Sequence, residues 1–176
     1  MRNAAPAHQA GFAALLCTIA FSAASGAATA AADELQALPQ TRSIYVEAGY
    51  TDHRGPATRT RTVGLRVPLQ HSWWQGRIRT HLDVYLSDWA STSAPPARRH
   101  TAQLGVVPMF RYRFADGQSP WFVEGGIGLS YLMATHYTPT GPFGSRWNFS
   151  DHLGGGRNFG AQQQHEVSLH AKHVSN

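Results

Sequence analysis

Apolar and polar residues alternate along much of this chain. In the stretch RIRTHLDVYL, residues 77–86, apolar residues occupy nearly every second position and charged residues lie between them. The apolar row consists of Ile78, Leu82, Val84 and Leu86, together with Thr80. The opposite row consists of Arg77, Arg79, His81, Asp83 and Tyr85. A period of two residues places these rows on opposite faces of a β-strand.

The same alternation recurs in QLGVVPMFRYRF and WFVEGGIGLSYL, residues 103–114 and 121–132. In the second stretch, the face opposite the apolar residues carries Glu124, Gly126, Gly128 and Ser130. Small residues on the inner face suit a narrow barrel. The pattern predicts four further strands, at roughly 42–51, 59–68, 145–156 and 164–175, so that seven strands are readable in all.

The connections between these strands alternate in length. PLQHSWWQG, ADGQSP and NFGAQQ are short, whereas SDWASTSAPPARRH and MATHYTPTGPFG are longer. This alternation is typical of an outer-membrane barrel, whose longer loops face outward. A soluble β-sandwich would also alternate apolar with polar residues and is the alternative. The charged rows, the aromatic residues near strand ends and the loop asymmetry favour an all-β fold, an outer-membrane antiparallel β-barrel.

The N-terminal segment has the pattern of a secretory signal peptide. Arg2 precedes the apolar run GFAALLCTIAFSAASG, and Ala28-Thr29-Ala30 offers a cleavage site. We therefore predict a signal peptide at residues 1–30 and a β-barrel domain at 31–176. Cys17, the one cysteine, lies in the predicted leader, so the exported part has no disulfide framework.

Charge points to an anionic partner. The chain has 15 Lys and Arg residues against 10 Asp and Glu. This excess suits a phosphorylated lipid, and export makes nucleic acid the poorer interpretation. Five arginines in or beside the predicted outward loops could bind lipopolysaccharide phosphates, although ordinary solvated loop charge is the alternative. They are Arg54, Arg59, Arg61, Arg98 and Arg99.

The last strand ends on residues suited to acyl transfer. In HEVSLHAKHVSN, His173 and Ser175 share a face with Val167, Leu169 and Ala171, which should contact lipid. Polar groups at such positions are costly and are therefore functional candidates. A histidine beside a serine can accept the serine proton, and Asn176 could donate hydrogen bonds to an oxyanion. The alternative is that His173 and Ser175 are simply polar residues at a solvated strand edge.

Three stretches together resemble a known family. FVEGGIGLSYL, FGSRWNFSDHLGGG and QHEVSLHAKHVSN, in this order, are similar to the lipid A 3-O-deacylase family of PagL-type outer-membrane enzymes. The resemblance implies an eight-stranded barrel that acts on lipid A of lipopolysaccharide in the outer membrane. By position, it implies that Ser175 is the nucleophile, His173 the general base and Asn176 a contributor to the oxyanion site. Phe149 and Asp151 match a Phe-x-Asp segment of the family, in a supporting role.

The family pattern continues beyond the point where this sequence stops. After His-x-Ser-Asn, the family has a glutamate that orients the histidine and an eighth strand, and neither has a counterpart after Asn176. We therefore expect a C-terminally incomplete barrel with the eighth strand missing. Because loss of the orienting acid costs orders of magnitude in rate, we also expect weak activity from the 176-residue chain.

Three function hypotheses follow. The first is a serine esterase acting on lipid A, the second a catalytically impaired remnant of such an enzyme, and the third a structural or adhesion-type barrel.

The stretch HEVSLH does not match a zinc motif. It is one residue longer than H-E-x-x-H and lies on a predicted strand, with His165 and His170 on opposite faces. We therefore expect no metal and no cofactor.

Overall fold

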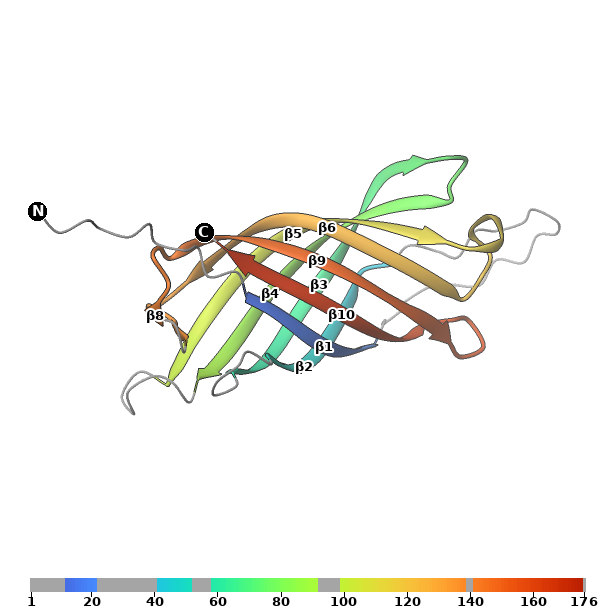
Figure 1. The fold of residues 1–176 in the computed structure, drawn as a ribbon. Helices are drawn as coiled ribbons and strands as arrows, with labels where there is room; N and C mark the ends of the chain where they lie inside the picture. Colours follow the sequence, from blue (N-terminus) through green and yellow to red (C-terminus); the bar gives the residue numbers. More distant parts are fainter. Residues whose placement is uncertain (1–11, 22–40, 52–57, 92–98, 139–140, 176) are drawn as a thin grey trace, which may run out of the picture.

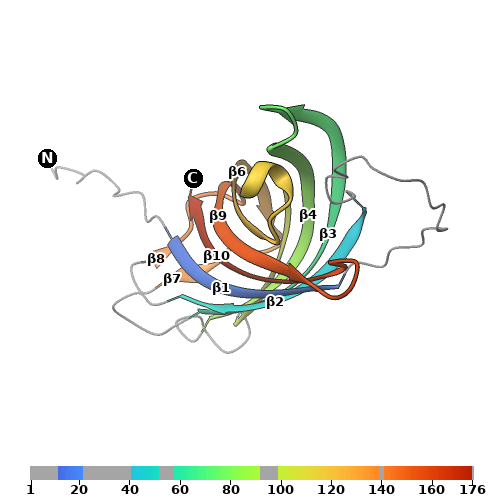
Figure 2. The same cartoon turned by 90° about the vertical axis from the view of Figure 1, so that its right-hand side faces the viewer.

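The protein is an antiparallel β-barrel. The computed structural model describes residues 12–21, 41–51, 58–91, 99–138 and 141–175. The barrel closes in the strand order β1-β10-β9-β6-β5-β4-β3-β2, and a two-stranded hairpin, β7-β8, lies apart from it (Figure 1). Figure 2 looks toward one end of the barrel and shows the strands wrapped around a common axis. The strands are β1 (Phe12–Phe21), β2 (Ser43–Tyr50), β3 (Thr58–Trp73), β4 (Ile78–Ser91), β5 (His100–Arg113), β6 (Trp121–Leu132), β7 (Tyr137–Thr138), β8 (Gly141–Pro142), β9 (Trp147–Phe159) and β10 (His165–Ser175).

All seven predicted strands are confirmed, as β2, β3, β4, β5, β6, β9 and β10. The eighth position, between β10 and β2, holds β1, which comes from the segment predicted to be a signal peptide (Figure 1). In hydrocarbon, unpaired backbone N–H and C=O groups cost several kcal/mol each, so the edges of β10 and β2 require a strand at this position. Cleavage of residues 1–30 stays a prediction.

The hairpin of β3 and β4 is longer than the sequence predicted. PLQHSWWQG was expected to be a connection, but β3 continues through most of it to Trp73. A register shift between Pro68 and Ser72 absorbs extra residues in β3, so that pairing with β4 resumes beyond the proline. The Thr80 hydroxyl donates a hydrogen bond to the His71 carbonyl across this irregularity, at 2.9 Å. The true turn is residues 74–77, in which Trp74, Gln75 and Gly76 all have positive φ.

The connections separate into a turn end and a loop end of the barrel. The turn end carries residues 74–77, 114–120 and 160–164. The loop end is where β2 is followed by β3, β4 by β5 and β6 by β9, and the hairpin β7-β8 lies between β6 and β9. Strand β10 starts at the turn end and finishes at the loop end (Figure 1). The two connections that the sequence predicted to be longer, after β4 and after β6, both lie at this end.

The predicted faces are also confirmed. On β6, Ile127 is 68% exposed on the outside, whereas Glu124 is 3% exposed in the lumen. On β4, Leu86 points outward and Tyr85 is buried inside. The outer wall is thus apolar and the lumen polar, which is the reverse of a soluble protein and the pattern of a membrane barrel. Within the described residues, no helix is long and apolar enough to span a membrane.

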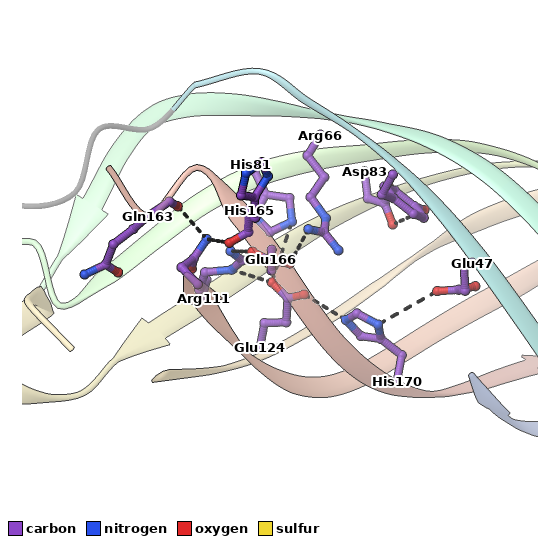
Figure 3. A network of polar contacts seen from close by, with 12 residues as sticks. Glu47, Arg66, His81, Asp83, Arg111, Glu124, Gln163, His165, Glu166 and His170 are labelled. Atoms are coloured by element: carbon purple, nitrogen blue, oxygen red, sulfur yellow. Dashed lines mark hydrogen bonds and ion pairs between the residues drawn. The ribbon is translucent and has the colours of Figure 1, made fainter. Parts of the chain in front are cut away.

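The lumen is filled by a network of buried ion pairs (Figure 3). Arg111 donates to Glu124 through Nε at 2.7 Å and to Glu166 through Nη1 at 2.6 Å. Arg66 donates to the same Glu166. The Nε2 atom of His170 lies 2.8 Å from Oε1 of Glu124. Each carboxylate is therefore held by charged or ring partners from other strands, which a buried charge needs.

Aromatic rings fill the rest of the lumen, and two glycines make room for them. The Tyr45 hydroxyl donates to Asp83 at 3.1 Å, and its ring lies against Gly64, where an added Cβ would be 2.2 Å from the ring. The Tyr85 ring lies against Gly105 in the same way, at 2.1 Å. Because real Cβ atoms do not approach so closely, any side chain at these glycines would displace an inward ring.

Candidate active site

The candidate nucleophile and base lie on the outer face of β10, near its loop end. Along this strand the residues alternate between buried and more exposed, and His173 and Ser175 belong to the outward row with Val167, Leu169 and Ala171. Both side chains are half-buried. Both residues lie on the outward face of the barrel, as the alternation predicted. Asn176 lies outside the described residues.

Strand β9 brings the Phe-x-Asp segment to the same place. Asp151 is the direct antiparallel partner of His173, and Phe149 is the partner of Ser175. Directly opposite residues in an antiparallel pair have Cβ atoms about 4.5–5.5 Å apart, so the carboxylate lies within reach of the imidazole. The register of β9 against β10 thus gathers four of the five predicted site residues into one outward patch.

Within the part of the chain that the structure describes, no hydrogen bond joins the polar groups of this patch. The imidazole of His173, the hydroxyl of Ser175 and the carboxylate of Asp151 each face outward without one. The two β10 residues are two positions apart, which separates their Cα atoms by about 6.6–6.8 Å along the strand. Their side chains stand side by side and are available to a third molecule.

A buried cluster at the loop end fixes the end of β10. Val174, between the two candidate catalytic residues, points into the lumen and packs with Trp89, Leu132 and Phe143. His136 joins this loop-end cluster, with its ring 4.9 Å from that of Trp89 in an edge-on contact. The inward anchoring of Val174 holds its two neighbours on the outside, because successive residues of a strand point to opposite faces.

Apolar and aromatic side chains surround the polar patch. Phe149 and Leu153 flank Asp151 on β9, and both are more than half exposed. Tyr131 and Trp147 form an edge-on aromatic pair at the loop end, with ring centroids 5.1 Å apart. Aromatic rings are concentrated where a barrel crosses the membrane–water interface. The patch therefore lies close to an interface and not at the centre of the apolar band.

The sequence did not predict the loop-end cluster. Its members come from β4, β6, the β6–β9 connection and β10, and alternation alone does not reveal which inward residues meet. The detectable signal was the apolar Val174 in an otherwise polar inward row of Glu166, Ser168, His170 and Lys172. An apolar residue at the end of a polar inward row indicates that the lining of the lumen changes there from polar to apolar.

The histidines of β10 do not converge. The His165 ring makes a tilted contact with the Phe159 ring, with centroids 5.4 Å apart, whereas His170 is buried in the lumen. Their predicted placement on opposite faces is confirmed. Among the residues that the structure describes, no group of three His, Cys, Asp or Glu side chains could hold a metal ion.

Comparisons with known proteins agree on one family. The family described as Lipid A 3-O-deacylase (PagL) matches residues 60–176. The lipid A deacylase PagL of Pseudomonas aeruginosa is 31% identical over 140 residues, which cover 78% of this chain and 76% of that protein. No solved structure matches the chain. The matched range contains the whole patch on β9 and β10.

Proposed function

The chain belongs to the lipid A 3-O-deacylase family, and we propose that it is a serine esterase that hydrolyses the 3-O-linked acyl chain of lipid A. The observation that carries the proposal is the outward patch, where Ser175 and His173 stand side by side opposite Asp151. A site on the outer wall of a barrel is accessible to a lipid within the membrane. A site in the lumen would not be, because the lumen is filled by ion pairs.

The reaction proceeds in two steps. His173 accepts the hydroxyl proton of Ser175 as the serine oxygen attacks the ester carbonyl. The ester C–O bond breaks, the sugar hydroxyl leaves with the proton from the imidazole, and the acyl chain remains on Ser175. Water, deprotonated by His173, then attacks the acyl-enzyme carbonyl. The bond between the acyl carbon and the Ser175 oxygen breaks, the imidazole returns the proton to Ser175, and the fatty acid leaves.

Three further residues support these steps. Asn176 contributes to the oxyanion site by donating hydrogen bonds to the developing negative charge. Asp151 lies where its carboxylate can orient the imidazole from the neighbouring strand. Phe149, beside Ser175, offers an exposed apolar surface to the acyl chain.

We place the barrel in the outer membrane, with its loop end at the cell surface and the site in the outer leaflet. Residues 1–30 are the signal peptide that directs export, and residues 31–176 are the barrel domain. N-terminal sequencing of the purified protein tests this, with a start after Ala30 as the expected result. If the purified protein retains residues 12–21, β1 is a permanent strand of the barrel and the prediction of a cleaved signal peptide is wrong.

The activity is tested on lipid A from cells that express the protein. Mass spectrometry should detect the loss of one 3-hydroxyacyl group, and Ser175→Ala should abolish this loss. A fluorophosphonate probe should label Ser175 and leave Ser168, which points into the lumen of the same strand, unlabelled. If intact lipid A is recovered and the probe does not react, the chain is a barrel without esterase activity.

A further inference from the structure

Two arginines stand on the outer wall at the loop end, away from the candidate active site. Arg59 and Arg61 occupy the outward row of β3, and both are exposed. Arg59 pairs with Tyr50 of β2, and Arg61 pairs with Ala48. Together with Gly49 and Thr60, these residues line an open groove of about 530 Å³. Tyr50 is more than half exposed beside it.

The charges of Arg59 and Arg61 differ from those of three other arginines of the barrel, which are neutralised by carboxylates. Arg66 and Arg111 are neutralised by carboxylates inside the lumen, and Arg77 pairs with Asp116 at the turn end. Within the described ranges, neither Arg59 nor Arg61 makes an ion pair. Asp88, the β4 partner of Arg61, is engaged with His100, whose Nδ1 lies 3.1 Å away.

The position of the two arginines along the strand indicates their depth in the membrane. The same outward row continues toward the turn end with Val63 and Leu65, which are exposed and apolar. An arginine on the lipid face costs about 2–4 kcal/mol at the midplane and about 0–1 kcal/mol near the interface. The change from Leu65 and Val63 to Arg61 and Arg59 therefore marks the level of the lipid headgroups.

We propose that Arg59 and Arg61 form a subsite that binds a phosphate of the lipid A headgroup and positions the substrate for the patch on β10. The inference rests on the proposed function, since it names how that substrate is held. Two guanidinium groups about 6.6–6.8 Å apart at their Cα atoms can converge on one phosphate, for which their forked donors are suited. Tyr50 lines the same groove, and a tyrosine hydroxyl can donate a hydrogen bond to a phosphate oxygen.

The subsite and the patch are close enough to share one lipid. Between β3 and β10 lie β2 and one further strand position, which β1 holds in the uncleaved chain. At about 4.8 Å per strand, the lateral distance between β3 and β10 is about 14 Å along the wall. A phosphorylated disaccharide with several acyl chains can lie across such a span. Phosphate binding at Arg59 and Arg61 would then fix which ester reaches Ser175.

Binding is measured without catalysis in the Ser175→Ala background, so that failure of the esterase proposal and failure of this inference are distinguishable. The detergent-solubilised full chain is titrated with phosphorylated lipid A and with dephosphorylated lipid A. Phosphorylated lipid A should bind more tightly. Arg59→Gln with Arg61→Gln should weaken its binding about 100-fold, about tenfold for each arginine, since tenfold corresponds to about 1.4 kcal/mol. Binding of dephosphorylated lipid A should not change.

Arg157→Gln is the matched control, because Arg157 is also an exposed, outward arginine but lies at the turn end of β9. It should leave both affinities unchanged. Arg59→Lys with Arg61→Lys keeps the charge and should retain most of the binding, which also verifies folding. Equal binding of phosphorylated lipid A to the glutamine variant and the parent would overturn the subsite. Equally tight, arginine-dependent binding of phosphatidylglycerol micelles would overturn its assignment to lipid A.

Discussion

The lumen and the outward patch on β9 and β10 use similar residues in opposite ways. In the lumen, Glu124 is held by Arg111 and His170, and it is almost fully buried. In the patch, Asp151 lies opposite His173 with no hydrogen bond within the described chain. Carboxylate and imidazole groups thus serve stability where buried partners hold them, as Arg111 and His170 hold Glu124. Where they are left available, they can serve chemistry.

The paired groups of the lumen contribute to stability, whereas the unpaired groups of the outward patch are available for activity. A buried carboxylate without its partners would be strongly destabilising, so the lumen network cannot be left incomplete. A half-buried serine or histidine at the interface can be solvated and costs little when it is unpaired. Substitutions in the patch should therefore change activity without changing stability, and substitutions in the lumen should do the reverse.

The largest effect is expected at His173. His173→Gln removes the proposed general base and should lower kcat by about 10²–10⁴-fold, since this is the usual contribution of a positioned base. The melting temperature should not change. His165→Gln, on the same outward row at the turn end, is the matched control and should keep full activity. Comparable loss from both variants would contradict the assignment.

The next effect concerns the lumen. Glu124→Ala leaves the buried guanidinium of Arg111 with one carboxylate fewer and should lower the free energy of unfolding by about 3–5 kcal/mol. Urea unfolding in detergent micelles measures the change. Asp151→Ala, the matched loss of a carboxylate from the outer wall, should cost less than about 1 kcal/mol. Equal losses of stability from Glu124→Ala and Asp151→Ala would show that the lumen and the outward patch contribute equally to stability.

A smaller effect is expected on the apolar outer wall. Val106 lies near the middle of β5 and faces outward. Val106→Arg should lower the stability in a bilayer by about 2–4 kcal/mol, the cost of a lipid-facing arginine at the midplane. Val106→Leu should be tolerated. Full tolerance of arginine would show that this face does not contact lipid.

The smallest effect comes from His136 in the loop-end cluster. Burial lowers the pKa of His136 to about 4, from about 6.5 in an unfolded chain. Between these values the unfolded chain binds a proton that the folded chain does not, so stability falls as the pH falls from 6.5 to 4. The slope is at most about 1.4 kcal/mol per pH unit. The free energy of unfolding is measured at pH 7 and at pH 5 for the parent and for His136→Phe. The His136→Phe variant should lack this contribution to the pH dependence.

The sequence predicted the strands and faces because alternation with a period of two is local. The sequence also predicted that Ser175 and His173 lie on the outward row, since polar residues in an otherwise apolar row are visible without a structure. Their catalytic roles stay a prediction. Contacts between distant residues were not predictable. Arg66 and Glu166 meet across 100 positions, and pairing register, which alternation does not specify, brings them together. The pairing of His173 with Asp151 depends in the same way on the turn that joins β9 to β10.

Other differences have local physical causes. A proline at position 68 favoured a strand end, yet the register shift between Pro68 and Ser72 lets β3 continue. The residues of β1 read as a leader because they are continuously apolar, and such a run can also form a strand. The separation of the histidines at 165 and 170 was predictable, because an odd spacing on a strand always reverses the face.

The packed lumen also bears on the permeability of the membrane that holds this barrel. The space lined by Arg66, Glu124 and His170 has no room for a water molecule. The cavity beside Glu47 and Tyr85, nearer the loop end, has a volume of about 20 Å³, enough for about one water molecule. Ions would have to break several salt bridges to pass. A cell could therefore carry many copies of this protein at its surface without leaking solutes through them, and planar bilayers containing it should show no conductance steps.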